Sequence, residues 1–409
     1  MKGEKAMPRA ISELNQDRVK QFIQYLEIMS QPAEVSGMTS NDLKQLFEAS
    51  KPLLHSLTPL EIFTAFSCRL ENGEQVSDIL AYLGKIINVL HQGLEQYEWT
   101  QPAKCTFLKV MMAENDALLA LLQDLKALVR PVWWQEHKNE LLTVLERLLA
   151  FDCHYLKKEN ILFPYMEKAD SRFNGLTIMW SLHDQAREQL RQLLDLVLSG
   201  SEDQTFVRQA GNLIFTMQGL VIKESLILYP AASELFTDDE FAGMLDQSFE
   251  YGFALIEPPA RPVSQREAIS EQPLLIESPT GRLTIDEALL IFNNLPVDIT
   301  FVDEHNKVRF FNKAKDRFFP RSPAVIGRDV NRCHPAESVH VVEEIIESFR
   351  IGRQDSASFW LELKNKMVLI QYIALRTEAG VYRGVLEVSQ DITGIRKLEG
   401  QRRLLQWDD

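Results

Sequence analysis

A short pattern of polar and apolar residues occurs twice in the middle of the chain and constrains its fold most. The first copy runs from His154 through Glu159 to Pro164, and the second runs from Leu220 through Glu224 to Pro230. Both copies lie in stretches with the apolar spacing of amphipathic helices. Imidazole and carboxylate side chains on facing helices are how metal-holding bundles are built. The repeat therefore predicts a four-helix bundle with a polar centre.

Four helical segments can be read around this repeat, within residues 99–256. They are residues 106–128, 133–163, 176–198 and 204–228. We expect the second and fourth segments to end at Pro164 and Pro230, because proline cannot continue a helix. Short connections between long helices favour an antiparallel arrangement.

The pooled interior of this bundle offers a set of candidate metal ligands. They are His154, Glu159, His183 and Glu224, with Asp184 and Glu114 as further donors. Imidazole together with carboxylate suits iron, manganese or zinc. The alternative interpretation is that the glutamates are solvated and the histidines are hydrogen-bonded core residues.

Neither copy of the repeat contains a complete His-x-x-x-carboxylate pair. Residues four apart share one face of a helix, but the position four after His154 is Lys158. Glu159 lies about 140° from His154 around an ideal helix. The second copy has Glu224 at the matching position but Leu220 in place of the histidine.

The regions on either side of the bundle differ in composition. Residues 1–98 have helical spacing throughout, and Thr58 followed by proline is a helix start. Residues 257–282 are rich in proline without apolar periodicity, which predicts a semi-rigid linker. Residues 283–395 combine one helix, two strands, further helices and three strands, and residues 396–409 are predicted to begin with a charged helix.

The C-terminal α+β region has two candidate binding features. Phe301, Phe310, Phe359 and Tyr372 line a predicted apolar pocket or form its core. The adjacent Cys333 and His334 are candidate haem or metal ligands, but neighbouring side chains rarely ligate the same centre. The alternative is that they shape a turn.

These motifs, in this order, resemble a bacterial family. His154, Lys158-Glu159, and Trp180 with His183-Asp184 resemble the hemerythrin-like HHE cation-binding bundle, and the C-terminal phrases resemble a PAS domain. The leader resembles the helical domain of unknown function 438. The resemblance implies a non-haem iron site, mono- or dinuclear, and dimerisation through the PAS domain. The histidines that this family carries on the first and fourth helices fall at Asn115 and Leu220 here.

Composition limits the possible partners. The net charge of -14 and the lack of a basic cluster disfavour nucleic acid and anionic membranes. Four scattered cysteines and no apolar run of about 20 residues predict a cytoplasmic protein without a membrane span.

Three functions remain open. The first is an iron-binding sensor or regulator that responds to oxygen, nitric oxide, redox state or iron and acts on a protein partner. The second is a di-iron enzyme for oxygen or nitric oxide reduction or for iron-centre repair, which the incomplete ligand set disfavours. The third is a metal-free adaptor. No nucleotide-binding loop or hydrolase elbow is visible in the sequence.

Overall fold

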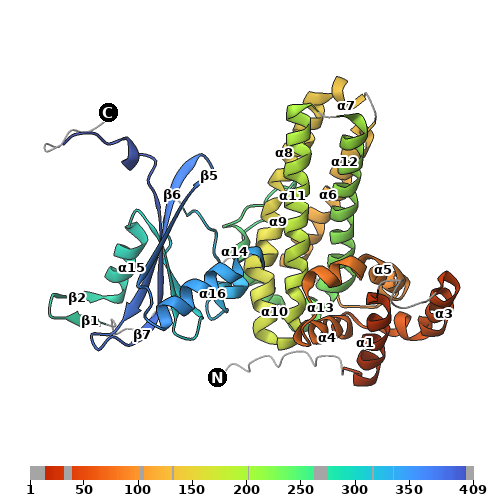
Figure 1. The fold of residues 1–409 in the computed structure, drawn as a ribbon, viewed down its shortest axis with the longest axis horizontal. Coiled ribbons are helices and arrows are strands. Elements are labelled where there is room, and N and C mark those ends of the chain that lie inside the picture. Colours follow the sequence, from red (N-terminus) through yellow and green to blue (C-terminus); the bar gives the residue numbers. More distant parts are fainter. Residues whose placement is uncertain are drawn as a thin grey trace. The chain divides into compact units, whose positions relative to one another are not determined.

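In the computed structural model of the protein, residues 14–31, 39–101, 106–130, 133–200, 202–261, 275–315, 317–334 and 336–401 are described. The chain divides into two compact units. Unit 1 consists of Met1–Ser264 and Ser322–Ala324, and unit 2 consists of Gln265–Arg321 and Val325–Asp409. The first is helical and the second contains the main sheet, so the predicted fold class is confirmed (Figure 1).

The leader of unit 1 forms helices where the sequence predicts them. They are α1 (Gln16–Ser30), α3 (Ser40–Ser56), α4 (Pro59–Glu71) and α5 (Val76–Glu95). Thr58 and Glu61 cap the start of α4 reciprocally, each side chain accepting a hydrogen bond from the backbone N–H of the other. This cap satisfies N–H groups that would otherwise lack a partner.

The bundle of unit 1 has long helices that run side by side in Figure 1. The long elements are α6 (Phe107–Leu128), α8 (Lys138–Ala150), α11 (Thr177–Ser199) and α12 (Asp203–Lys223). Shorter helices are α7 (Trp133–Glu136), α9 (Asp152–Lys157), α10 (Phe163–Ala169), η2 (Ser171–Leu176), α13 (Tyr229–Leu235) and α14 (Asp238–Ser248). Gly200, with φ of 76°, ends α11 in the left-handed conformation.

The predicted helix ends at Pro164 and Pro230 are wrong, because both helices continue past the proline. A π-helical turn precedes each one: η1 (Lys158–Leu162) and η3 (Glu224–Leu228). Each proline then occupies the first turn of the next α-helix, where its missing N–H is tolerated. The repeated sequence pattern therefore encodes a repeated π turn, and such turns are frequent at functional sites.

The leader and the bundle, predicted as separate regions, share one hydrophobic core. The ring centroids of Phe63 in α4 and Phe173 in η2 lie 5.1 Å apart. The backbone N–H of Gly175 donates to the hydroxyl of Ser67 over 2.9 Å. The leader thus packs directly against the segment that joins the second and third bundle helices.

One helical run in unit 1 has the length and composition of a membrane span. Among the described residues this is Asp203–Leu235, in which an 18-residue window has a mean hydropathy of 1.2 and is half buried. Its buried side chains include Glu224 and belong to the core of the bundle. A core helix of a bundle passes the same test of length and hydropathy.

Unit 2 contains a five-stranded antiparallel sheet. The strands are β3 (Asp298–Asp303), β4 (Val308–Phe311), β5 (Ser356–Leu363), β6 (Lys366–Arg376) and β7 (Tyr382–Asp391), in the order β4-β3-β7-β6-β5. Helix α16 (Ala336–Arg350) packs on one face, which we call the inner face, through Ile346 and Phe349. Helix α15 (Ile285–Asn294) contacts the opposite, outer face, where Phe292 lies 5.7 Å from Phe310.

The boundaries of unit 2 differ from the predicted ones at both ends. Much of the predicted linker, residues 262–274, lies outside the described residues, and its end forms a hairpin of β1 (Leu275–Ser278) and β2 (Gly281–Thr284). Up to residue 401, where the described part of the chain ends, the predicted C-terminal helix consists only of the short η6 (Ile395–Lys397). Gly400, with φ of 64°, is incompatible with a continuing helix, and residues 402–409 are not described.

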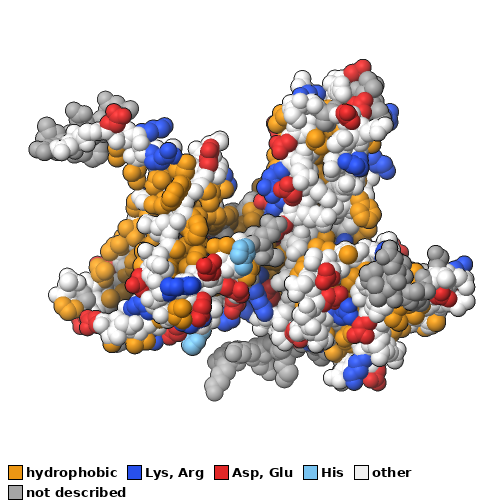
Figure 2. All heavy atoms as spheres, viewed as in Figure 1, with side chains coloured by type: hydrophobic (Ala, Val, Ile, Leu, Met, Phe, Trp, Pro, Cys, Tyr) orange, Lys and Arg blue, Asp and Glu red, His pale blue; other side chains and the backbone are white. Residues whose placement is uncertain are grey.

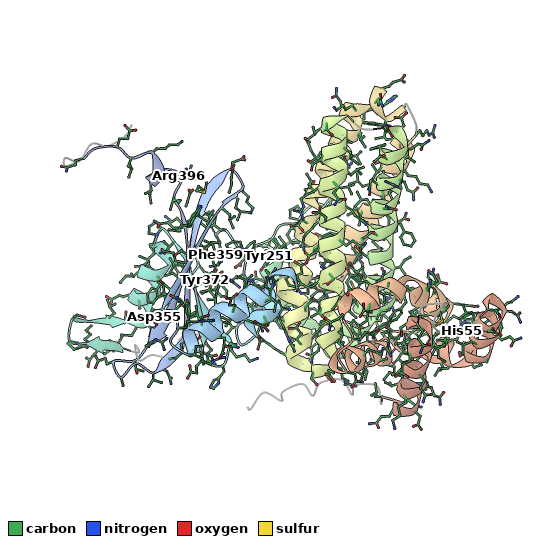
Figure 3. The ribbon with its side chains drawn as sticks, viewed as in Figure 1. His55, Tyr251, Asp355, Phe359, Tyr372 and Arg396 are labelled. Carbon is green, nitrogen blue, oxygen red and sulfur yellow. The ribbon has the colours of Figure 1, made fainter. Side chains whose placement is uncertain are left out.

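The four predicted pocket residues of unit 2 do not line one pocket. Phe301 pairs with Phe310 on the outer face, whereas Phe359 and Tyr372 lie 6.1 Å apart on the inner face (Figure 3). The alternation of side chains along a strand separates the two pairs. Tyr372 and His334 instead line a cavity of about 30 Å³ between the sheet and α16.

Candidate functional site

The four predicted ligands are carried by three segments of the bundle. His154 lies on α9 and His183 lies on α11, whereas Glu159 is the second residue of η1 and Glu224 is the first residue of η3. All four side chains are buried. Because a π turn closes its hydrogen bond over five residues, it accommodates Glu159 inside the bundle although an ideal α-helix would turn it away from His154.

The structure joins these side chains in two pairs rather than in one set of four. Nε2 of His154 lies 3.0 Å from Oε2 of Glu224, and Nδ1 of His183 lies 2.8 Å from Oε1 of Glu159. Within the described part of the chain, no group of three His, Cys, Asp or Glu side chains is arranged to hold a metal ion. The single four-residue ligand set therefore stays a prediction.

The first pair belongs to a central cluster of five buried side chains: Glu114, His154, Lys157, Lys158 and Glu224. His154 bridges the two carboxylates, because its Nδ1 lies 2.7 Å from Oε2 of Glu114 while its Nε2 faces Glu224. Lys157 donates to Oε1 of Glu114, and Lys158 donates to Oε1 of Glu224. Two carboxylates thus meet two ammonium groups around one imidazole.

Further donors complete the central cluster. Asn115 and Tyr229 both donate to Oε2 of Glu224, over 2.9 and 2.7 Å. The backbone N–H of Ala254 donates to Oε1 of Glu114 over 2.8 Å, and Lys157 also donates to the carbonyl of Gly252 over 3.0 Å. Every carboxylate oxygen of the cluster therefore accepts at least one hydrogen bond from the protein.

The electrostatics of the central cluster favour charged carboxylates. Burial alone would raise the pKa of Glu224, but Lys158 and His154 hold that pKa well below its usual value. Burial would likewise raise the pKa of Glu114, and the hydrogen bond and charge of His154, together with Lys157, lower it. Burial lowers the pKa of Lys158, and Glu224 opposes that shift. The carboxylates remain ionised because cations are built in beside them.

The second pair belongs to a flanking cluster of Asp152, Glu159, His183 and Arg187. Arg187 donates to both oxygens of Glu159, over 2.9 and 3.0 Å, and to Asp152 over 2.7 Å. Although burial would raise the pKa of Glu159, His183 and Arg187 lower it to about 2. Burial and the nearby Lys158 ammonium lower the pKa of His183 to about 3, so this imidazole is neutral. Its Nε2 is buried without a hydrogen-bond partner.

The central cluster does not fit a metal ion as it stands. Both ring nitrogens of His154 face carboxylate oxygens, so neither nitrogen is open to a metal. Ammonium groups already bind Glu114 and Glu224. His183 has the arrangement of a ligand histidine, with Nδ1 on a carboxylate and Nε2 without a partner. One such nitrogen is fewer than a metal site needs.

Several members of the two clusters were not predicted from the sequence. Lys157, Lys158, Tyr229 and Arg187 did not enter the candidate set, whereas Glu114 did so as a further donor. The available signal was the position of Lys158, which follows His154 by four residues and aligns with Glu224 in the second copy. A lysine on the ligand face of a buried helix requires a buried anion.

The fold and the clusters define a class of protein, a helical bundle with a buried imidazole–carboxylate centre joined to an antiparallel sensor-type sheet. Residues 106–232 match the model of the hemerythrin HHE cation binding domain, and residues 289–393 match that of a PAS domain. The chain therefore contains the two domains that the sequence predicted, and this combination indicates a sensor or regulatory protein. Neither match includes residues 1–98, so the identity of the leader stays a prediction.

Solved structures also resemble parts of the chain. The C-terminal domain of a protein from Streptococcus mutans is 32% identical with a TM-score of 0.30, and the match covers 32% of this chain and 100% of that one. A PAS domain from Colwellia psychrerythraea is 20% identical, with a TM-score of 0.22 and coverage of 27% and 98%. The PAS domain of BvgS from Bordetella pertussis is 17% identical, with a TM-score of 0.23 and coverage of 28% and 92%. No curated protein matches the chain.

Proposed function

We propose that the chain is a regulatory protein that acts by protein contact, and that unit 2 pairs with a second copy of the chain. The supporting observation is an exposed apolar surface on α15 and the outer face of the sheet, the α15–sheet surface (Figure 2). It consists of Leu289, Leu290, Ile291, Phe292, Trp360 and Ile373. Leu290 is 65% exposed and Trp360 is 70% exposed. Grouped apolar residues of this kind mark interaction sites.

The charge of α15 supports a second copy as the occupant. The helix has Asp286 and Glu287 in its first turn but no charged residue from Ala288 to Asn294. In a symmetric dimer the same patch faces itself, so like charges would oppose one another. The chain has a net charge of -14, which generally opposes self-association. On this helix two copies could meet with little electrostatic repulsion.

The space between the sheet and α16 of unit 2 leaves no room for a drug-sized ligand. The cavity between the sheet and α16 holds about 30 Å³ of free space, roughly the share of one water molecule in the liquid. Val302, Ile346 and Tyr372 fill the rest of that interior. A drug-sized ligand needs roughly 300 Å³ or more.

Light scattering of the purified full chain tests this proposal. We expect the wild-type protein to be a dimer and Leu290→Glu to shift it to the monomer, because the new carboxylate would face its own copy. Phe215→Glu is the matched control, since Phe215 is 73% exposed on α12 of unit 1. A monomeric wild-type chain, or equal dissociation by both variants, would refute the proposed contact.

Iron-responsive sensing is the second candidate function. It is favoured by the cation-binding family of residues 106–232 and by the carboxylate-held imidazole of His183. This function would require Lys157 and Lys158 to release Glu114 and Glu224. Stoichiometric iron in the protein from iron-supplemented cells, lost in His154→Ala and His183→Ala, is the result that would establish it.

A further inference from the structure

Each buried glutamate in the two clusters has its own basic side chain. Lys157 binds Glu114, Lys158 binds Glu224, and Arg187 binds Glu159. The ammonium groups of both lysines are fully buried. Burying a charge is costly unless an opposite charge and hydrogen bonds compensate it. The pairing of cation and anion is therefore a requirement of this core.

We propose that the ammonium groups of Lys157 and Lys158 are the resident cations of the bundle, in the place where the HHE domain is described as binding a cation. The bundle folds and functions without a metal ion. This inference goes beyond the proposed dimerisation of unit 2 and is independent of it, because its contacts all lie within unit 1.

Lys158 follows His154 by four residues, at a position where a metal ligand would fit. A carboxylate four residues after His154 would share a helix face with the imidazole and complete a ligand pair. Lys158 occupies that position and reverses the sign of its charge. Its ammonium binds Glu224 and lies 4.8 Å from the ring centroid of Tyr155. The position four residues after His154 thus carries a cation in this chain.

The ammonium of Lys157 makes a second set of buried contacts. Its ammonium binds Glu114 and the carbonyl of Gly252, and it lies 4.8 Å from the ring centroid of Phe253. These partners come from α6 and from the segment after α14, so the ammonium ties the end of unit 1 to the bundle. A divalent ion entering the centre would meet both ammonium groups and would repel them.

The other side chains that contact the two carboxylates are His154, Asn115 and Tyr229. His154 uses both ring nitrogens on Glu114 and Glu224. The side-chain amide of Asn115 donates a hydrogen bond to Glu224. Donors and cations thus surround both carboxylates, as expected of a closed, ion-paired centre.

Metal content and thermal stability of the full chain test the proposal. The wild-type protein, from iron-supplemented cells or after anaerobic incubation with Fe²⁺ or with Zn²⁺, is expected to hold far less than one ion per chain. Its melting temperature should not change with EDTA. Stoichiometric metal that survives dialysis, with a melting temperature that falls on chelation, would overturn the proposal. This wild-type result is decisive by itself if the variants do not fold.

The variant Lys158→Met removes one ammonium and leaves Glu224 without its cation. We expect its melting temperature to fall by about 10 °C. Zn²⁺ should restore part of that loss by supplying the missing charge. Lys223→Met is the matched control, because the charge of Glu224 acts on Lys223 too but its ammonium donates to the carbonyl of Gly219 over 3.0 Å. A loss in Lys158→Met no larger than in Lys223→Met, or equal restoration by Zn²⁺ in both, would contradict the role of Lys158.

Discussion

The two units fill their interiors in opposite ways. In unit 1 the centre is occupied by ionised side chains of the protein, with Lys157 and Lys158 on Glu114 and Glu224. In unit 2 the space between the sheet and α16 is occupied by hydrocarbon side chains such as Val302 and Ile346, and little free volume remains. An expected ligand position can therefore be closed either by charge or by packing.

The largest expected effect breaks the ion-paired centre of unit 1. Glu224→Leu removes the partner of Lys158 and His154, and an uncompensated buried ammonium costs about 3–5 kcal/mol of unfolding free energy. Urea unfolding followed by the helical circular dichroism signal measures the loss. The double variant Lys158→Met/Glu224→Leu should lose much less, because both charges leave together. Additive losses in the double variant would show that the two residues do not act as a pair.

A smaller effect is expected from the apolar interior of unit 2. Phe349 is buried on α16, and Phe349→Ala should cost about 3 kcal/mol through lost packing and the cavity that it leaves. Hydrogen exchange read by mass spectrometry should show faster exchange in β3, β6 and β7, with α6 and α11 unchanged. Phe359→Ala is the control at the same sheet, since Phe359 is an exposed ring. Equal exchange in both variants would be evidence against a packed interior around Phe349.

The sequence predicted the elements of both units better than the contents of their interiors. Apolar periodicity and caps such as Thr58 located the helices, because those signals are local. The ends at Pro164 and Pro230 were mispredicted because the preceding π turns have no distinct propensity signal. The partner of Lys158 is Glu224, which lies 66 residues further along the chain. No local sequence rule predicts this pair. Charge pairs between residues far apart in the sequence could therefore not be predicted.

Both units contain a buried histidine, and the one in unit 2 should make stability depend on pH. His334 in unit 2 is largely buried, and burial together with the nearby Arg321 lowers its pKa to about 4. The usual pKa of histidine is about 6.5. As pH falls from about 6.5 to about 4, His334 therefore gains a proton in the unfolded chain but not in the folded one. Stability is full above that window and decreases within it. Because His334 keeps some solvent contact, we expect a loss of about 1–2 kcal/mol between pH 7.5 and pH 5.

The variant His334→Gln isolates this contribution, because every other group titrates in both proteins. The difference in unfolding free energy between variant and wild type should change by the same amount over that pH range. A constant difference would mean that His334 is protonated equally in the folded and unfolded chain. The buried His183 is present in both proteins and cancels from the comparison.

The smallest expected effect separates hydrogen bonding from charge within the central cluster. Tyr229→Phe removes the hydroxyl that donates to Oε2 of Glu224 over 2.7 Å but leaves Lys158 and His154 in place. Asn115 still donates to the same oxygen, so no carboxylate oxygen loses its last partner. We expect a loss of about 1 kcal/mol in urea unfolding, the net worth of one buried hydrogen bond. A loss as large as that of Glu224→Leu would mean that the phenol, rather than the ammonium, holds this carboxylate in the core.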